Sequence, residues 1–331
     1  MKSPISGKEM TFHKEKRTMT FRKEEFEVLY HFYLCEDSKE QFTTTELDNL
    51  NLYQLHNQYR AKYHLPFPDQ IKSLREKYDL PASKMAEVLG FGINVYRNYE
   101  NGEIPSESNA RLIQLAEDAI EFKKLLMLST AFSGSDLDKQ ILKIEHLMEA
   151  DKNNFNFDIE KFLMGNKLPS EYTGFKVPQL SKFIEMIVFF AQLKPWKTKM
   201  NKLLFYSDFL HFKETCFSIS GAQYKAISKG PVPKNFGGIF DFAADNDFVD
   251  IMYYEFDKGY GELFEPNKNK KFNPSLFTKS ELGVIKKVAN NFKESTTSEI
   301  VEISHAEKAW KENVDGYNLI SYKYGFDIIT I

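Results

Sequence analysis

The chain has 331 residues, a formal net charge of −3 and 15% aromatic residues, including 30 phenylalanines. This length allows two or three domains, and the supply of apolar side chains excludes a globally disordered chain. The longest apolar run, around 187–193, is far shorter than the roughly 20 residues needed to cross a bilayer. The start, MKSPISGKEM, lacks a signal peptide's hydrophobic segment. The two cysteines, Cys35 and Cys216, are far apart, so we expect reduced thiols in a cytoplasmic protein without membrane contact.

Residues 1–57 are expected to form a small module with β content. Short β-prone runs occur at 10–13 and 17–21, and an aromatic run follows within 24–35. A helix should begin in the segment 41–46. Thr44 or Thr45 is its expected cap, because a threonine hydroxyl accepts hydrogen bonds from the free N–H groups of a first helical turn.

The segment 66–130 has the pattern of an all-α domain of short helices. Apolar residues recur three and four positions apart, and turn signals separate the groups. Gly90 should end the second helix, because glycine adopts the left-handed conformation without steric cost. The expected buried residues of the first two helices are Ile71, Leu74, Tyr78, Met85, Val88 and Leu89.

A third helix should span about 92–100, and Ser106 should open a fourth. From Ala110 to Thr130 the chain can continue as one long helix. Two pairs of residues compete for the buried side of the third helix: Ile93 with Tyr96, or Val95 with Tyr99.

Two helices joined by a short glycine-containing turn form a helix-turn-helix unit, whose second helix enters the major groove of DNA. The order IKSLRE, LPASKMAEVLGFG and YENGEIPS resembles Xre/Cro-type repressors, and above all the C-terminal domain of MqsA-type antitoxins. The resemblance implies an operator-binding domain, with a bundle used only for dimerisation as the alternative. The expected DNA-binding residues are Ser83, Lys84, Gly92, Asn94, Arg97 and Asn98.

These residues have different expected roles. By position Asn94 matches a base-reading asparagine of that family, whereas Asn98 stands where the family has an arginine and Arg97 lies one residue earlier. Asparagine suits a bidentate contact with adenine, and arginine with guanine. Ser83, Lys84 and the Gly92 backbone suit phosphate contacts near a helix N-terminus.

The charge of this region argues against strong non-specific DNA binding. Residues 61–122 contain seven basic and ten acidic side chains, a net charge of 7 − 10 = −3. A strong general binder carries a basic surface instead. We therefore expect binding that requires a dimer and two half-sites.

The N-terminal module resembles the zinc-binding module of MqsA-type antitoxins, which has two Cys-x-x-Cys pairs. Here only Cys35 remains, while Ser3, Ser6 and Ser38 stand at the other ligand positions. One thiolate does not make a four-cysteine zinc site, so we predict a degenerate, metal-free module. The alternative is a site that combines Cys35 with His13 or His31.

Residues 131–177 are expected to link the N-terminal part to a C-terminal domain. A helix should restart at Ser135 and run to about Ala150, and the following stretch to Pro178 is rich in Asn, Gly, Pro and Lys.

Residues 178–331 should form an α-rich domain with a small antiparallel sheet. Helices are expected at 181–193, 198–214, 235–244 and 278–292, with a last helical pair over 298–310. An alternating run at 218–227 predicts a strand that leads into a turn at Lys229–Pro233. The segments 250–256 and 261–266 predict two further strands.

Three blocks of this region resemble the Panacea, or SocA-associated, domain: KMNKLLFYSDFLHF, ISGAQYKAISKGPVP and SHAEKAW. Members of that family are mostly antitoxins that bind diverse toxins directly, and one type delivers its toxin to a protease. The resemblance implies a protein toxin as partner. The candidate toxin-binding residues are Tyr206, Tyr224, Lys229, Tyr253, Tyr254 and Phe256.

The polar residues of these blocks allow more than one role. Tyr206, Asp208, Tyr224 and Lys229 form either a cluster that fixes the fold or part of a binding groove, and Gly230-Pro231 indicates a structural turn. His211 and His305 raise the possibility of catalysis. Without a nucleophile motif, a phosphate loop or metal-ligand spacing, we predict structural histidines, no catalytic residue, no metal and no cofactor.

The sequence thus predicts an α+β, mainly α protein that acts as a type II antitoxin. It would neutralise a cognate toxin through 178–331 and repress its operon through operator DNA bound by 66–130. It would act as a homodimer or a toxin–antitoxin heteromer. The alternatives are a transcriptional regulator with a C-terminal sensor or protease-adaptor domain, and an enzyme that uses His211 or His305.

Overall fold

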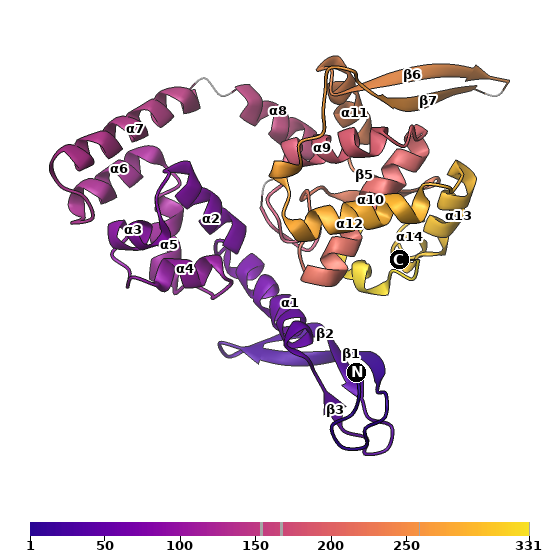
Figure 1. The fold of residues 1–331 in the computed structure, drawn as a ribbon, viewed down its shortest axis with the longest axis horizontal. Coiled ribbons are helices and arrows are strands. Elements are labelled where there is room, and N and C mark those ends of the chain that lie inside the picture. The colour runs from indigo at the N-terminus through magenta and orange to yellow at the C-terminus, as the bar shows by residue number, and fades with distance from the viewer. Residues whose placement is uncertain (153–154, 166–167, 258, 331) are drawn as a thin grey trace. The chain divides into compact units, whose positions relative to one another are not determined.

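The structure is a computed structural model and describes residues 1–152, 155–165, 168–257 and 259–330. The chain is α+β and mainly helical, as predicted, with small antiparallel sheets (Figure 1). It divides into two compact units, Met1–Asp158 and Ile159–Ile331. Among the described residues, no helix combines the length and the apolar character needed to span a membrane.

The first unit begins with a long β-hairpin. Strands β1 (Thr11–Phe21) and β2 (Glu24–Leu34) pair antiparallel over their whole length, and β3 (Gln41–Phe42) adds to the end of β2. The hairpin turn, Arg22-Lys23, has positive φ at both residues, as the tightest hairpin turns require. The β content is therefore as predicted. The following helix begins only at Thr45, with the Thr44 hydroxyl accepting from the N–H of Leu47.

Helix α1 (Thr45–Tyr63) covers the free edge of β2 with side-chain amides. Asn51 exchanges two hydrogen bonds with the backbone of His31, at 2.9 and 3.0 Å, and Gln54 exchanges two with Leu29, at 2.9 and 2.8 Å. These amides satisfy backbone groups that a neighbouring strand would otherwise pair. An exposed strand edge invites pairing with other chains, so this arrangement protects the hairpin from aggregation.

The next helices pack around one apolar core. They are α2 (Pro68–Lys77), α3 (Ala82–Val88), α4 (Val95–Glu100), α5 (Glu107–Leu115), α6 (Ala119–Leu128) and α7 (Gly134–Lys152). The six residues predicted for the core of the first two helices are all buried. Tyr78 also stacks on Phe122 of α6, with ring centroids 3.7 Å apart.

The predicted long helix over 110–130 is wrong, because two helices occupy it. Helix α5 ends at Leu115 and α6 begins at Ala119. The Asp118 carboxylate accepts from the N–H groups of Ile120 and Glu121, at 2.7 and 3.2 Å. An aspartate that caps a new helix in this way competes with continuation of the preceding one.

The predicted linker, 131–177, contains more helix than expected. Helix α7 matches the predicted restart near Ser135, but α8 (Phe155–Met164) lies in the stretch expected to be irregular. Residues 153–154 and 166–167 of this segment lie outside the described residues.

The second unit is built around a buried central helix, α10 (Lys197–Thr215). After α10 the chain forms β4 (Tyr224–Ile227) and β5 (Gly230–Pro233). The helices that follow are α11 (Phe236–Asp245), α12 (Lys279–Phe292), α13 (Thr297–Ala306) and α14 (Lys308–Lys311). Helix α9 (Leu180–Ala191) and the short helices η1 (Pro274–Leu276) and η2 (Tyr322–Asp327) complete it. The predicted strand over 218–227 begins only at Tyr224, and Gly230–Pro233 forms its partner strand β5.

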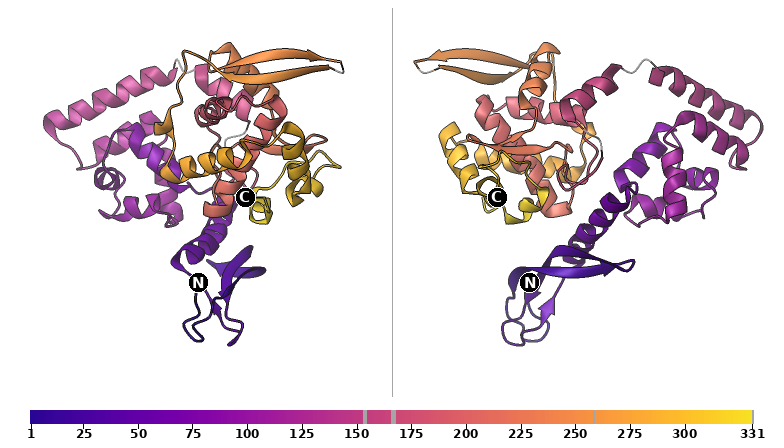
Figure 2. Two further views of the ribbon diagram at one scale, coloured as in Figure 1. Left: turned by 45° about the vertical axis from the view of Figure 1, so that its right-hand side comes forward. Right: turned by 180° about the vertical axis from the view of Figure 1, so that it is seen from behind.

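Strands β6 (Val249–Phe256) and β7 (Gly259–Pro266) form a separate hairpin of the second unit. Figure 2 shows this hairpin extending away from the helices of its own unit in both views. Its base is held by Pro195, whose carbonyl accepts from the N–H of Phe264 at 3.0 Å. The rest of β6 is largely exposed.

Candidate functional site

The expected DNA-contacting residues lie around the start of α4. Gly90 has a φ of +71°, as a left-handed end to α3 requires, and residues 91–94 lead into α4. Gly92, Asn94, Arg97 and Asn98 are all exposed. The structure therefore brings four of the six predicted residues onto one accessible segment.

The opposite side of α4 fixes this segment to the core. Tyr96 is buried, and its hydroxyl donates to the Ile71 carbonyl at 2.7 Å. Glu100 pairs with Arg75 of α2 at 2.6 Å. Of the alternatives for the buried side, Val95 packs on the core and Tyr99 is buried, whereas the Ile93 side chain is 72% exposed.

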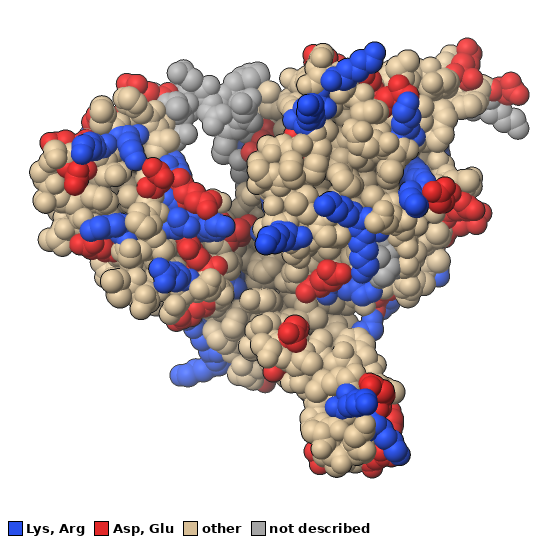
Figure 3. All heavy atoms as spheres, viewed as in Figure 1, with Lys and Arg blue, Asp and Glu red and all other residues tan. Residues whose placement is uncertain are grey.

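Ser83 and Lys84 are only partly exposed. The Lys84 ammonium donates to Glu87 at 2.8 Å and to the Ala131 carbonyl at 2.7 Å. A phosphate contact from Lys84 would have to compete with both. Figure 3 shows acidic and basic side chains interspersed over the visible face of this unit, in keeping with the near balance of its charges.

The N-terminal module gathers three serines around one thiol. The Ser3 hydroxyl donates to Cys35 Sγ at 3.1 Å, and Ser6 Oγ lies 3.5 Å from the same sulfur. Hydrogen bonds from Ser3, Ser38 and Ser6 lower the pKa of the Cys35 thiol to about 6. The four residues expected at the ligand positions of a zinc module are thus neighbours in space.

The alternative histidine ligands are engaged elsewhere. The His13 ring stacks on Phe32 and the His31 ring on Phe12. In the described part of the chain, no group of three or more His, Cys, Asp or Glu side chains is placed to hold a metal ion.

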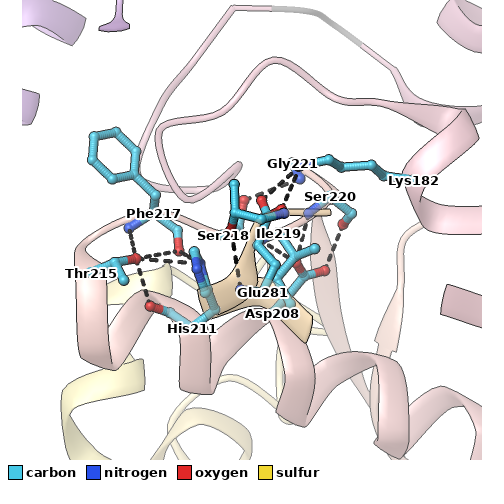
Figure 4. Close-up of polar contacts among 11 residues, drawn as sticks. Lys182, Asp208, His211, Thr215, Phe217, Ser218, Ile219, Ser220, Gly221 and Glu281 are labelled. Atoms are coloured by element: carbon cyan, nitrogen blue, oxygen red, sulfur yellow. Dashed lines mark hydrogen bonds and ion pairs between the residues drawn. The ribbon is translucent and has the colours of Figure 1, made fainter. Parts of the chain in front are cut away.

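In the second unit, Asp208 organises a buried polar cluster (Figure 4). Its Oδ1 accepts from the backbone N–H groups of Ile219 and Ser220, at 2.8 and 2.9 Å. Its Oδ2 accepts from the hydroxyls of Ser220 and Tyr224, at 2.6 and 2.8 Å. Burial raises the pKa of Asp208, while these four donors oppose the rise. The cluster joins α10, the loop 218–221 and β4.

The residues predicted to bind a toxin separate into two groups. Tyr206 and Tyr224 are fully buried, and the Tyr206 hydroxyl donates to Glu307 at 3.4 Å. These two side chains hold the core together rather than reaching the surface. Lys229 and the hairpin residues Tyr253, Tyr254 and Phe256 are exposed.

The two histidines have structural surroundings. His211 is buried, its Nδ1 lies 2.7 Å from the Phe217 carbonyl oxygen, and burial lowers its pKa to about 4 (Figure 4). The His305 ring stacks on Trp310, with centroids 3.8 Å apart, and burial also lowers its pKa. Burial therefore disfavours the charged form of both histidines, and both rings are held by packing.

Gly230 explains why the predicted turn carries a glycine. Its φ is +98°, and a Cβ there would lie 2.6 Å from Ser304 Oγ and 2.7 Å from Lys202 Cε. The Lys202 side chain is fully buried and donates to the Pro231 carbonyl at 2.9 Å, and burial lowers its pKa to about 7. Sequence patterning missed Lys202, because a lysine on a helix ordinarily marks an exposed face.

None of the curated proteins compared with the chain matches it. Residues 200–311 match the family described as "Antitoxin SocA-like, Panacea domain". The matched segment runs from within α10 to the end of α14 and so contains the Asp208 cluster, Gly230 and the β6–β7 hairpin. The match supports an antitoxin-type domain in the C-terminal part of this chain.

Proposed function

We propose that the chain is an antitoxin that binds a protein toxin through residues 178–331 and represses its own operon through residues 66–130. Residues 1–57 would be a metal-free module and 131–177 a helical linker. The family match at 200–311 is the observation that carries the proposal. The toxin would be neutralised by occlusion within a heteromer, so no residue of this chain needs to act catalytically.

We place the toxin-binding surface on the β6–β7 hairpin. Tyr253 is 68% exposed and Phe256 is 53% exposed, and Tyr254 and Met252 are exposed as well. Large aromatic side chains are the commonest energetic anchors of protein interfaces. A two-stranded hairpin with little cover is only marginally stable alone, so a partner that packs on it gains affinity and also orders it. Lys229, which lines a pocket together with Phe256 and Tyr260, would lie at the rim.

The proposal predicts the outcome of a co-expression experiment. The toxin gene adjacent to this one should arrest growth alone, and co-expression of the full chain should restore growth. The variant Tyr253→Ala should fail to restore growth while keeping the thermal unfolding midpoint of the parent chain. Growth arrest that persists with the parent chain would refute the antitoxin role.

A matched control tests the location of the interface. Tyr317 is also a largely exposed tyrosine of the second unit, but it lies outside the hairpin. Tyr317→Ala should neutralise like the parent. If the hairpin variant neutralises equally well, the toxin binds elsewhere on the domain.

A further inference from the structure

A second candidate site is a cavity beside the turn end of the β6–β7 hairpin. It has a volume of about 680 Å³ and is lined by the first turn of α10, by Lys229, by the hairpin and by the start of α13. Pockets for small ligands commonly measure about 300–1,000 Å³. The volume is therefore sufficient for a ligand much larger than a single ion.

The lining is rich in lysine, and two of the lysines form no ion pair in the described part of the chain. Lys197 pairs with Glu262 at 2.8 Å, and Lys194 pairs with Glu265 at 2.8 Å. Among the described residues, Lys199 and Lys229 form no ion pair. Lys199 is only 7% exposed, and its ammonium donates to the carbonyls of Lys293 and Ser295, at 3.4 and 2.5 Å.

Burial lowers the pKa of Lys199, and the charges of Glu294 and Glu299 oppose this shift. An anion in the cavity would further favour the charged form of Lys199. Lys229 is exposed on the turn between β4 and β5 and lines the same cavity. The cavity is therefore lined by two lysines that form no ion pair among the described residues.

The first turn of α10 adds backbone donors to these charges. Trp196 caps the helix without a side-chain hydrogen bond, and the N–H groups of Lys197, Thr198 and Lys199 have no acceptor among the described residues. A helix of 19 residues carries a partial positive charge at this end. Free N–H groups together with lysines form a typical arrangement for a phosphate group.

The other wall of the cavity is aromatic. Trp196 meets Phe256 edge to face at 5.6 Å, and Tyr260 is 76% exposed at the cavity. Gly261 lies against both rings, since a Cβ there would be 2.7 Å from Phe256 and 2.8 Å from Trp196. Aromatic faces stack on nucleobases regardless of the base.

We propose that this cavity binds a nucleoside phosphate, with the phosphate at the first turn of α10 between Lys199 and Lys229 and the base against Phe256 and Tyr260. The inference does not depend on a toxin partner. It joins a phosphate site and a base-stacking wall within one cavity of suitable size.

Isothermal titration of the full chain with ATP, GTP, adenosine and inorganic phosphate tests the proposal. At least one nucleotide should bind tenfold or more tightly than adenosine or inorganic phosphate. Lys229→Ala and Lys199→Met should each weaken nucleotide binding at least tenfold. Lys229 is exposed, so Lys229→Ala should fold like the parent. This variant therefore still tests the proposal if Lys199→Met unfolds. Lys234→Ala, an exposed lysine that does not line the cavity, should bind like the parent.

Four outcomes would overturn the proposal. Inorganic phosphate could bind as tightly as the nucleotides, which would indicate an adventitious ion only. Nucleotide binding could be unchanged in both lysine variants. Nucleotide binding could also be lost in Arg97→Ala, which would place the nucleotide site on the DNA-facing segment. Finally, the lysine variants could abolish toxin neutralisation while no nucleotide binds, which would make the cavity part of a protein interface.

Discussion

The hydroxyl of Tyr224 donates to Oδ2 of Asp208 at 2.8 Å, and neither side chain reaches solvent. Asp208 lies in the first of the three sequence blocks that resemble the Panacea domain, and Tyr224 lies in the second. The third block joins the same core through Glu307, which accepts from Tyr206. The three blocks are thus linked by buried polar contacts, so part of the motif serves the fold rather than a binding surface.

Asp208→Ala should destabilise the second unit strongly. The substitution leaves the buried N–H groups of Ile219 and Ser220 without their acceptor and removes the partner of Tyr224. Disruption of a buried polar network of this kind costs about 3–5 kcal/mol. Thermal unfolding of the full chain should show a lower midpoint for one transition. Asp241→Ala, an exposed aspartate on α11, should unfold like the parent, and equal midpoints for both variants would contradict the assigned role.

Gly230→Ala should also destabilise the second unit. At a φ of +98° an alanine is strained, and its Cβ would meet Ser304 Oγ at 2.6 Å and the Lys202 side chain at 2.7 Å. We expect a loss of about 1–3 kcal/mol, measured as a shift of the denaturant midpoint. Gly237→Ala on α11 is the control, because a Cβ there meets nothing within 4 Å and should leave stability unchanged or slightly higher. Equal stability of the two variants would show that the β4–β5 turn relaxes freely.

Periodicity predicted most of the helices because their apolar spacing reflects burial directly. Ile71, Leu74 and Tyr78 show this, since each lies in the core where its spacing placed it. Helix α10 shows the limit, because its polar residues Lys202 and Asp208 are buried beside its apolar ones. Hydrophobic periodicity assigns polar residues to the surface. It therefore does not predict a buried lysine or aspartate whose hydrogen-bond partners are backbone groups in another segment of the chain.

The same limit applies to the candidate sites. The exposed aromatics of β6 were predicted as possible contacts, but Tyr206 and Tyr224 have the same residue type and are buried. The exposure of a tyrosine depends on whether its side of the helix or strand packs on the core. That packing is set by the tertiary structure and cannot be read from the residue type. The sequence also did not predict that the lysines at the start of α10 line one cavity with Lys229. This arrangement depends on contacts between segments about 30 residues apart.

The Cys35 side chain is only 2% exposed, and its thiol should be a thiolate at neutral pH. Its pKa is lowered to about 6 by the serine hydroxyls, whereas burial raises the pKa of Cys216 well above its usual range. The rate of Cys35 alkylation by iodoacetamide, followed by peptide mass spectrometry, should rise with a midpoint near pH 6. Ser3→Ala should move the midpoint to higher pH, and Cys216→Ser should leave it unchanged. A midpoint near 9 in the parent chain would contradict the hydrogen-bonded arrangement.

The same shift makes the stability of the N-terminal module depend on pH. Between about pH 6 and the ordinary thiol value of 9.0, the unfolded chain binds a proton that the folded module has released. Stability should therefore rise as pH increases through this window, and the gain should be lost as pH falls through about 6. Cys35→Ser should remove this part of the pH dependence, which hydrogen exchange of β1 and β2 amides can follow.

The exposed segment at α4 should read operator DNA. Arg97 is exposed and forms no ion pair within the described part of the chain, and Asn94 is exposed at the start of the helix. A bidentate base contact is worth about 1–3 kcal/mol, so Asn94→Ala or Arg97→Ala should weaken binding to the chain's own promoter roughly 5- to 150-fold. Fluorescence anisotropy at fixed salt measures this, and toxin neutralisation by both variants should be unchanged.

Arg111→Ala is the control that distinguishes loss of a base contact from loss of a positive charge. Arg111 is exposed on α5 and pairs with Glu107 at 3.3 Å, so its loss removes the same charge from a different face. Promoter affinity should change little in this variant, and affinity for random DNA should be similar in Arg97→Ala and Arg111→Ala. Loss of a base contact weakens only the specific complex. If both variants lose promoter and random DNA binding equally, the contact is electrostatic and α4 does not read the DNA sequence.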